Sequence, residues 1–136
     1  MAEILLEARN LSRVLAGDVP VTLVREAHVT VRTGTFVAIT GPSGSGKSSL
    51  LYLLGLLDRP TGGMIFMQGQ DMSALSEQAL AQWRLEKLGF IFQFHFLLPE
   101  FSLCENIMIP MRKLGKLSEE AMRTRAEKLL ADLDLA

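Results

Sequence analysis

The chain has 136 residues, a length that suits one domain with a hydrophobic core. Its formal net charge of −1 excludes the strongly basic composition of dedicated nucleic-acid binders, so we expect no nucleic-acid partner. Cys104 is the single cysteine of the sequence, which excludes an intrachain disulfide and a cysteine metal cluster.

The segment before residue 41 predicts β-strands. Residues 4–11 are rich in aliphatic side chains, and we expect a short strand there. Apolar and polar side chains alternate from residue 27 to residue 32, which is typical of a strand with one buried face. Residues 36–40 form a continuous apolar run, and such a run predicts a strand that is covered on both faces.

Residues 41–48 carry the most informative motif of the chain, Gly-Pro-Ser-Gly-Ser-Gly-Lys-Ser. This is the pattern of the P-loop, in which glycines let successive backbone N–H groups point at phosphate oxygens. Lys47 is predicted to reach the β- and γ-phosphates, Ser48 to hold Mg²⁺ and Ser49 to contact the α-phosphate. The predicted nucleotide-binding residues are Gly41, Pro42, Ser43, Gly44, Ser45, Gly46, Lys47, Ser48 and Ser49.

The surroundings of the motif support this interpretation. A predicted strand precedes the loop, and the apolar residues 48–57 predict a helix after it. The helix N-terminus adds the positive end of its dipole to a phosphate site. We therefore predict an α/β fold with the core of a P-loop nucleoside triphosphatase.

The middle of the chain predicts a turn, a strand and a helix. Pro60 and the two glycines that follow mark a turn at 58–63. A strand is expected over 64–68, and a turn over 69–71 follows it. Ser76 is a predicted N-cap for a helix that ends near Lys87.

The last part of the chain predicts one strand and two helices. Four phenylalanines alternate with other residues over 90–96, which is typical of a buried strand. A helix is expected from Ser102 to Met111, with Pro110 interrupting it. Ser118 is a predicted N-cap for a final helix, whose apolar stripe comprises Met122, Ala126, Leu129, Leu130 and Leu133.

Gln93 lies at the end of the predicted strand, where α/β proteins place ligand groups. It is a candidate for contact with Mg²⁺ or with attacking water; the alternative is a polar residue that marks the exit of the strand. Hydrolysis also needs an acidic residue at a strand end to hold Mg²⁺. Asp58, Asp132 and Asp134 follow or lie in helical patterns and do not fit, so we expect this chain to lack the acidic half of the site.

Together, residues 41–48, 58–63 and 89–107 resemble the ATP-binding subunits of ABC transporters, in particular the lipoprotein-releasing and macrolide-exporter group. The resemblance covers essentially the whole chain in order and spacing. It implies that residues 1–136 are the N-terminal part of a single ABC ATP-binding domain. The implied fold adds an N-terminal antiparallel β subdomain to the P-loop core.

The resemblance also implies a function and a set of partners. The cofactors are ATP and Mg²⁺, and ATP hydrolysis is coupled to transport. Lys47 and Gln93 are the implied catalytic residues, with Gln93 contacting Mg²⁺ or the attacking water, and Ser48 and Gln93 are the implied metal contacts. Residues Phe94 to Phe101 would lie near the groove for the coupling helix of a transmembrane permease subunit, and a second ATP-binding subunit would complete a dimer.

The chain departs from the family in two respects. Val14 and Leu15 stand where the family usually has an aromatic residue that stacks on adenine. The family's signature sequence, catalytic glutamate and switch histidine come later than residue 136. We therefore expect the chain by itself to bind nucleotide with little or no ATP hydrolysis.

Guanylate kinases also carry a Gly-Pro-Ser-Gly run, so a nucleotide kinase is one alternative, and a truncated nucleotide-binding fragment without turnover is the other. The N-terminus lacks a basic region followed by an apolar stretch, and the apolar run 50–57 is too short to span a bilayer. We expect a cytoplasmic protein, peripheral on the inner face of the plasma membrane.

Overall fold

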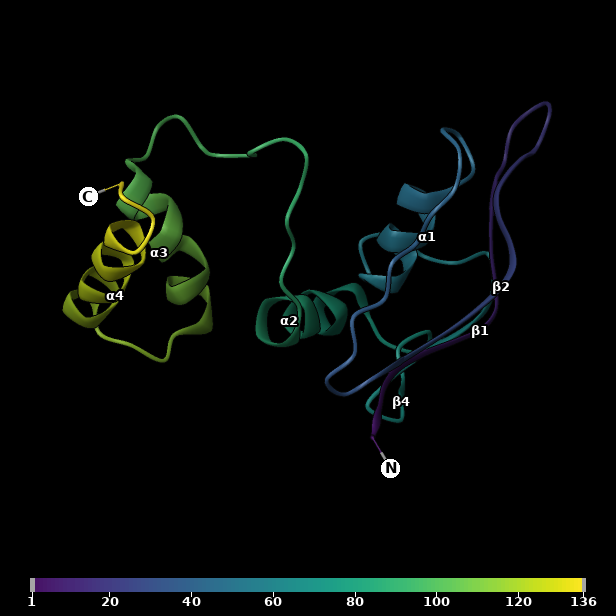
Figure 1. Ribbon diagram of the computed structural model, residues 1–136, viewed down its shortest axis with the longest axis horizontal. Coiled ribbons are helices and arrows are strands. Elements are labelled where there is room, and N and C mark those ends of the chain that lie inside the picture. Colours follow the sequence, from purple (N-terminus) through teal and green to yellow (C-terminus); the bar gives the residue numbers. More distant parts are fainter. Residues whose placement is uncertain (1, 136) are drawn as a thin grey trace. The chain divides into compact units, whose positions relative to one another are not determined.

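The computed structural model describes residues 2–135 and divides into two compact units, one ending at Arg84 and one beginning at Leu85 (Figure 1). The N-terminal unit contains β1 (Ile4–Leu15), β2 (Val21–Arg32), α1 (Lys47–Leu54), β3 (Gly62–Met67) and β4 (Gln70–Asp71). It also holds most of α2 (Glu77–Lys87). The C-terminal unit contains α3 (Leu103–Leu114) and α4 (Glu119–Ala131).

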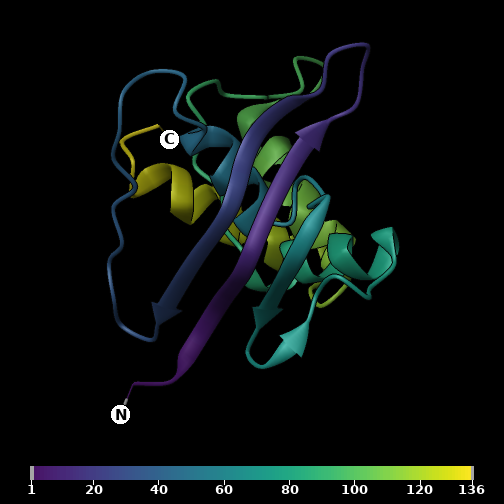
Figure 2. The same cartoon turned by 90° about the vertical axis from the view of Figure 1, so that its right-hand side faces the viewer.

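The N-terminal unit is built on a four-stranded sheet of order β2-β1-β3-β4. Every neighbouring pair is antiparallel, and Figure 2 shows β1 running between β2 and β3. The predicted antiparallel β subdomain is therefore confirmed. Both β1 and β2 are longer than predicted, because their pairing continues to Leu15 and Val21 at the hairpin end.

The predicted alternation in β2 is also confirmed. The apolar set is half-buried and the polar set is exposed, as one covered face requires. The half-buried residues are Ala27, Val29 and Val31, and the exposed residues are His28, Thr30 and Arg32.

A hairpin joins β3 to β4 at the turn expected near residue 69. Gln68 and Gly69 have φ angles of 49° and 79°, and they connect the paired residues Met67 and Gln70. Positive φ at both loop residues is the mark of a type I′ turn, whose twist matches that of the strands. Ser76 caps α2 as predicted, because its Oγ accepts from the Ala79 N–H at 3.2 Å.

The core of the N-terminal unit lies between the sheet and its helices. Leu11 and Leu53 are fully buried, and Ile65 and Met72 are nearly so. Burying such side chains contributes roughly 1.5–3 kcal/mol each. The buried residues of this unit are Ala8, Leu11, Val24, Leu53, Leu54, Leu56, Ile65, Met67, Met72 and Leu80.

Two predicted strands are wrong. Residues 36–40 and 90–96 form no strand, and Phe36 is 94% exposed while Ile91 is fully exposed. A continuous apolar run becomes a buried strand only when neighbouring strands pair with it and other layers cover its faces. Within residues 2–135, no segment pairs with either run.

The C-terminal unit is a pair of packed helices, α3 and α4. Met108 of α3 packs with Met122 and Ala126 of α4 in its buried core. Ser118 caps α4 as predicted, since its Oγ accepts from the Ala121 N–H at 3.2 Å.

The predicted apolar stripe of α4 is only partly correct. Met122, Ala126 and Leu130 are buried, whereas Leu129 is 43% exposed and Leu133 is 69% exposed. Residues spaced by four share one helical face, and Leu129 lies to the side of that face. Leu133 lies beyond α4, which ends at Ala131.

The predicted interruption of α3 is wrong, because the helix runs through Pro110 to Leu114. Proline removes one N–H and crowds the carbonyl four residues earlier, so this continuation costs free energy. Packing of α3 against α4 offsets that cost.

Candidate nucleotide-binding site

The P-loop leads directly into helix α1. Gly46 is the N-cap of α1 with a left-handed φ of 89°, and its carbonyl accepts from the Leu50 N–H at 2.8 Å. No side chain caps this end of the helix. Its first N–H groups are thus available to an anion, which the helix dipole also favours.

Gly46 is also the point where the loop touches the sheet. A Cβ atom at Gly46 would lie 2.4 Å from the backbone oxygen of Leu23 in β2. The left-handed φ strains any residue that has a side chain, and the close approach leaves no room for a Cβ atom. The third glycine of the motif is therefore required by both backbone conformation and packing.

Lys47 braces the loop from inside. Its Nζ donates to the carbonyls of Gly41 at 2.8 Å and Pro42 at 2.6 Å, and it approaches Ser45 Oγ at 3.4 Å. An ammonium group has three donors, and two of them hold the start of the loop around the lysine. The third makes the longest contact, which a phosphate oxygen can replace at little cost.

Strand β2 forms a wall beside the loop. A surface hollow of about 440 Å³ lies between Val21, Thr22 and Leu23 of β2 and the loop residues. The loop side comprises Ser43, Gly44, Gly46, Lys47, Ser48 and Ser49. A hollow of this size is within the range of small-ligand sites, and it brings the predicted phosphate contacts together.

Aliphatic side chains surround the hairpin end of this wall. Val14 pairs with Thr22 and Leu15 pairs with Val21, and Leu15 and Val21 are 42% and 52% exposed. Neither β1 nor β2 contains Phe, Tyr or Trp. The departure from the usual aromatic position therefore holds in the folded strands as well as in the sequence.

Gln93 belongs to the C-terminal unit and lies in an exposed segment, not at the end of a strand. Aromatic contacts shape this segment. The ring of Phe92 stacks on Phe90 at a centroid distance of 5.6 Å and meets Phe96 edge-on at 5.0 Å. Three of the four predicted alternating phenylalanines thus gather on one side without forming a strand.

Comparison with known proteins identifies the family. Residues 24–136 match the ABC transporter family. This chain belongs to that family. Lipoprotein-releasing system ATP-binding protein LolD of Aquifex aeolicus (strain VF5) is 47% identical over 135 residues, which are 99% of this chain and 58% of the relative.

Two further proteins support the assignment. LolD 2 of Caulobacter vibrioides (strain ATCC 19089 / CIP 103742 / CB 15) is 47% identical over 138 residues, covering 99% of this chain and 59% of the relative. A solved dimeric post-hydrolysis state of the ATP-binding cassette MJ0796, bound to ADP and Pi, superposes with a TM-score of 0.85. It is 32% identical over 93% of this chain and 56% of that structure. The chain thus spans less than two thirds of the length of these relatives.

Family membership confirms the resemblance and the fold class drawn from the sequence. Within residues 2–135, no three His, Cys, Asp or Glu side chains are grouped as metal ligands. None of the helices in the described part of the chain has the length and apolar character needed to cross a membrane.

Sequence reasoning missed two features of this site and one feature of the C-terminal unit. The β2 wall at Val21–Leu23, the carbonyl contacts of Lys47 and the side-chain bonds of Asn106 all depend on backbone placement. The β2 wall lies beside a loop that is distant from it in the chain, and a linear motif does not predict such a contact. Asn106 had a partial signal, because an asparagine four residues after Ser102 can bond to the start of its own helix.

Proposed function

We propose that this chain is the ATP-binding part of the energy-coupling subunit of an ABC transporter of the lipoprotein-releasing type. The observation that carries the proposal is the loop braced by Lys47 at the uncapped N-terminus of α1. Identity of 47% to LolD ATP-binding proteins supports the transporter type. Both units, residues 1–136, then belong to a single ATP-binding domain.

The residues of the loop fit a Mg²⁺–nucleotide. Backbone N–H groups of 43–49 would surround the phosphates, Lys47 would reach the β- and γ-phosphates, and Ser49 would contact the α-phosphate. The Ser48 hydroxyl lies in the same hollow and would hold Mg²⁺. Mg²⁺ held there would neutralise negative charge on the phosphates when the γ-phosphoryl group is transferred to water.

Gln93 would contact Mg²⁺ or orient the attacking water, which makes it the second catalytic residue beside Lys47. Its exposed segment leaves the amide accessible. The reaction proposed for the intact protein is hydrolysis of ATP coupled to transport.

The proposed partners are a transmembrane permease subunit and a second ATP-binding subunit. Residues 94–101 carry exposed apolar side chains, with Phe94 69% and Phe96 66% exposed, and such a patch suits a protein partner. The dimeric state of the MJ0796 cassette supports the second subunit. We place the chain at the cytoplasmic face of the plasma membrane, and propose no nucleic-acid partner.

Titration with a fluorescent ATP analogue and Mg²⁺ tests the nucleotide site. Lys47→Ala should weaken binding by roughly 10- to 100-fold, because it removes a charge-assisted contact to phosphate and the brace of the loop. Lys116→Ala on the C-terminal unit removes the same charge and should change affinity less than about twofold. Equal affinity of the Lys47→Ala variant and the wild type would contradict the proposed site.

Phosphotransfer assays separate the transporter subunit from a nucleotide kinase. Incubation with ATP and GMP or AMP should give no transfer above background. Steady transfer to either acceptor would contradict the transporter function. The same samples test the expectation that the chain alone hydrolyses little or no ATP. Steady hydrolysis by the wild type that is lost in Lys47→Ala would contradict this expectation.

A further inference from the structure

The side chain of Asn106 binds the backbone of the turn that precedes α3. Its Oδ1 accepts from the Leu98 N–H at 2.9 Å. Its Nδ2 donates to the carbonyls of Leu98 at 3.1 Å, Phe101 at 3.1 Å and Ser102 at 3.0 Å. Since Nδ2 has two hydrogens, at least one of them is shared between two carbonyls. We call this set of bonds the Asn106 clamp.

The clamp covers the end of the proposed membrane-partner segment, residues 94–101. Before Leu98, the Leu97 N–H lies 3.5 Å from His95 Nδ1, at the limit of a hydrogen bond. From Leu98 onward, Asn106 and a 3.2 Å bond from the Phe101 N–H to the Leu98 carbonyl hold the backbone. Asn106 itself is half-buried, whereas Leu98 and Phe101 are 46% and 43% exposed.

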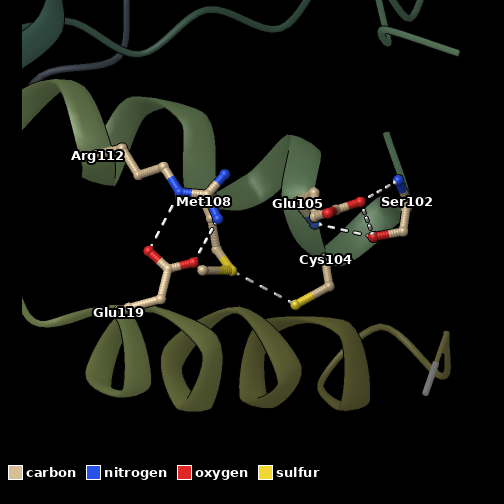
Figure 3. Close-up of polar contacts among 6 residues, drawn as sticks. All are labelled: Ser102, Cys104, Glu105, Met108, Arg112 and Glu119. Atoms are coloured by element: carbon tan, nitrogen blue, oxygen red, sulfur yellow. Dashed lines mark hydrogen bonds and ion pairs between the residues drawn. The ribbon is translucent and has the colours of Figure 1, made fainter. Parts of the chain in front are cut away.

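The N-cap of α3 is a separate device. Glu105 accepts from the N–H and the Oγ of Ser102, both at 2.8 Å, and Ser102 Oγ accepts from the Glu105 N–H at 3.2 Å (Figure 3). This reciprocal pair satisfies the start of the helix without using the Asn106 side chain. Cap and clamp can therefore be removed one at a time.

Asn106 lies on α3, which packs against α4. Asn106 lies two residues before the fully buried Met108, and Arg112 pairs with Glu119 at the start of α4 (Figure 3). The clamp thus ties the turn at 98–102 to the packed helices α3 and α4.

We infer that Asn106 is a positioning residue that holds residues 98–101 ready for the membrane partner. This inference rests on the proposed function of the 94–101 segment. A turn that is already ordered before binding loses little backbone conformational entropy when the partner binds, so the complex is tighter than with a disordered turn. The clamp leaves the side chains of Leu98 and Phe101 outside while it uses their backbone groups.

The first measurement is amide hydrogen exchange on the full chain. Asn106→Ala should speed exchange at Leu98 by about tenfold or more, since its N–H loses its acceptor. Asn106→Asp keeps an acceptor for that N–H but loses the donors to three carbonyls. The Leu98 N–H should therefore exchange more slowly in Asn106→Asp than in Asn106→Ala. A purely steric role of Asn106 would not produce this difference.

The second measurement is affinity for the proposed transmembrane permease subunit, held in detergent micelles. Asn106→Ala and Asn106→Asp should each weaken this binding by about tenfold, with Mg²⁺–ATP affinity unchanged within about twofold. Ser102→Ala, the matched control, destroys the cap and should leave partner affinity within about twofold of the wild type.

Three results would overturn the inference. Unchanged partner affinity of Asn106→Ala, despite fast exchange at Leu98, removes the positioning role. An equal loss in Ser102→Ala shows that the stability of α3, and not the clamp, matters. A wild-type chain that keeps Leu98 protected but does not bind the membrane subunit contradicts the proposed docking function itself, and the exchange data identify that case.

Discussion

The backbone oxygen of Leu23 stands 2.4 Å from the position that a Cβ atom of Gly46 would occupy. The P-loop is therefore in direct contact with strand β2, at the residue that starts helix α1. A phosphate-binding motif that is local in the sequence depends here on a strand more than twenty residues away.

Gly46→Ala tests this contact. The left-handed φ alone costs about 1–2 kcal/mol for a side chain, and the clash with a backbone atom adds to it. We expect a loss of roughly 3 kcal/mol in unfolding free energy and a large loss of Mg²⁺–ATP affinity. Thermal denaturation and nucleotide titration measure the two effects.

Gly44→Ala is the matched control. Gly44 has a similar φ of 78°, but a Cβ atom there meets nothing within 4 Å. Its cost should stay near 1–2 kcal/mol. Equal destabilisation by the two substitutions would show that the Leu23 contact does not matter.

A second prediction concerns the ion pair of Arg13 and Asp58. Arg13 Nε donates to Asp58 Oδ2 at 2.7 Å, and their side chains are 24% and 35% exposed. The pair ties the turn after α1 to β1. Each alanine substitution should lower the unfolding free energy by about 1 kcal/mol, with a coupling of about 0.5–1 kcal/mol in a double-mutant cycle.

Asp58→Asn refines that experiment. The amide oxygen can still accept from the Arg59 N–H, which now bonds to Asp58 Oδ1 at 2.8 Å. Only the charge is lost, so Asp58→Asn should recover part of the stability lost in Asp58→Ala. Additive effects in the cycle would show that the ion pair adds nothing to stability.

Pro110→Ala should stabilise the C-terminal unit. Proline in a helix interior costs about 3 kcal/mol relative to alanine, and α3 is continuous on both sides of it. The exposed position leaves room for alanine, so we expect a gain of about 1–3 kcal/mol in denaturant unfolding followed by circular dichroism. Unchanged or reduced stability would mean that the ring of Pro110 makes compensating contacts.

The N-cap of α3 should respond to pH. The hydrogen bonds from Ser102 favour the ionised Glu105 and hold the pKa of its carboxyl below the ordinary glutamate value. A carboxyl with a lowered pKa in the folded state contributes stability above its unfolded pKa. That contribution is lost as the pH falls through the folded pKa.

Helicity measured by circular dichroism from about pH 6 to about pH 2 follows this loss. Glu105→Gln should flatten part of the curve. A remainder is expected from Glu119, because the bond from Arg112 also lowers the pKa of that carboxyl. An unchanged curve in Glu105→Gln would contradict the assignment.

Features with local causes were predictable from the sequence. The P-loop follows from Gly, Lys and Ser at set spacing, and the N-caps at Ser76 and Ser118 follow from side chains that bond to N–H groups three residues on. The half-buried face of β2 follows from strict alternation. Each of these signals is complete within a few residues.

Features that depend on distant partners were not predictable. The apolar runs at 36–40 and 90–96 have the composition of buried strands, but a strand exists only where another segment pairs with it. The helical period of α4 likewise did not show that Leu129 is exposed, because the face that is buried depends on where α3 lies. Leu133 is exposed because the helix ends before it, at Ala131.

The candidate site divides in the same way. Its chemistry could be predicted from Lys47 and Ser48, because an ammonium and a hydroxyl group after a glycine-rich loop suit phosphate and Mg²⁺. Its shape could be seen only in the folded structure, where β2 forms one wall of the hollow and Gly46 packs against Leu23 with no room for a side chain. The physical reason is that residue types set which bonds a group can make, whereas packing between segments distant in the chain sets which bonds are in reach.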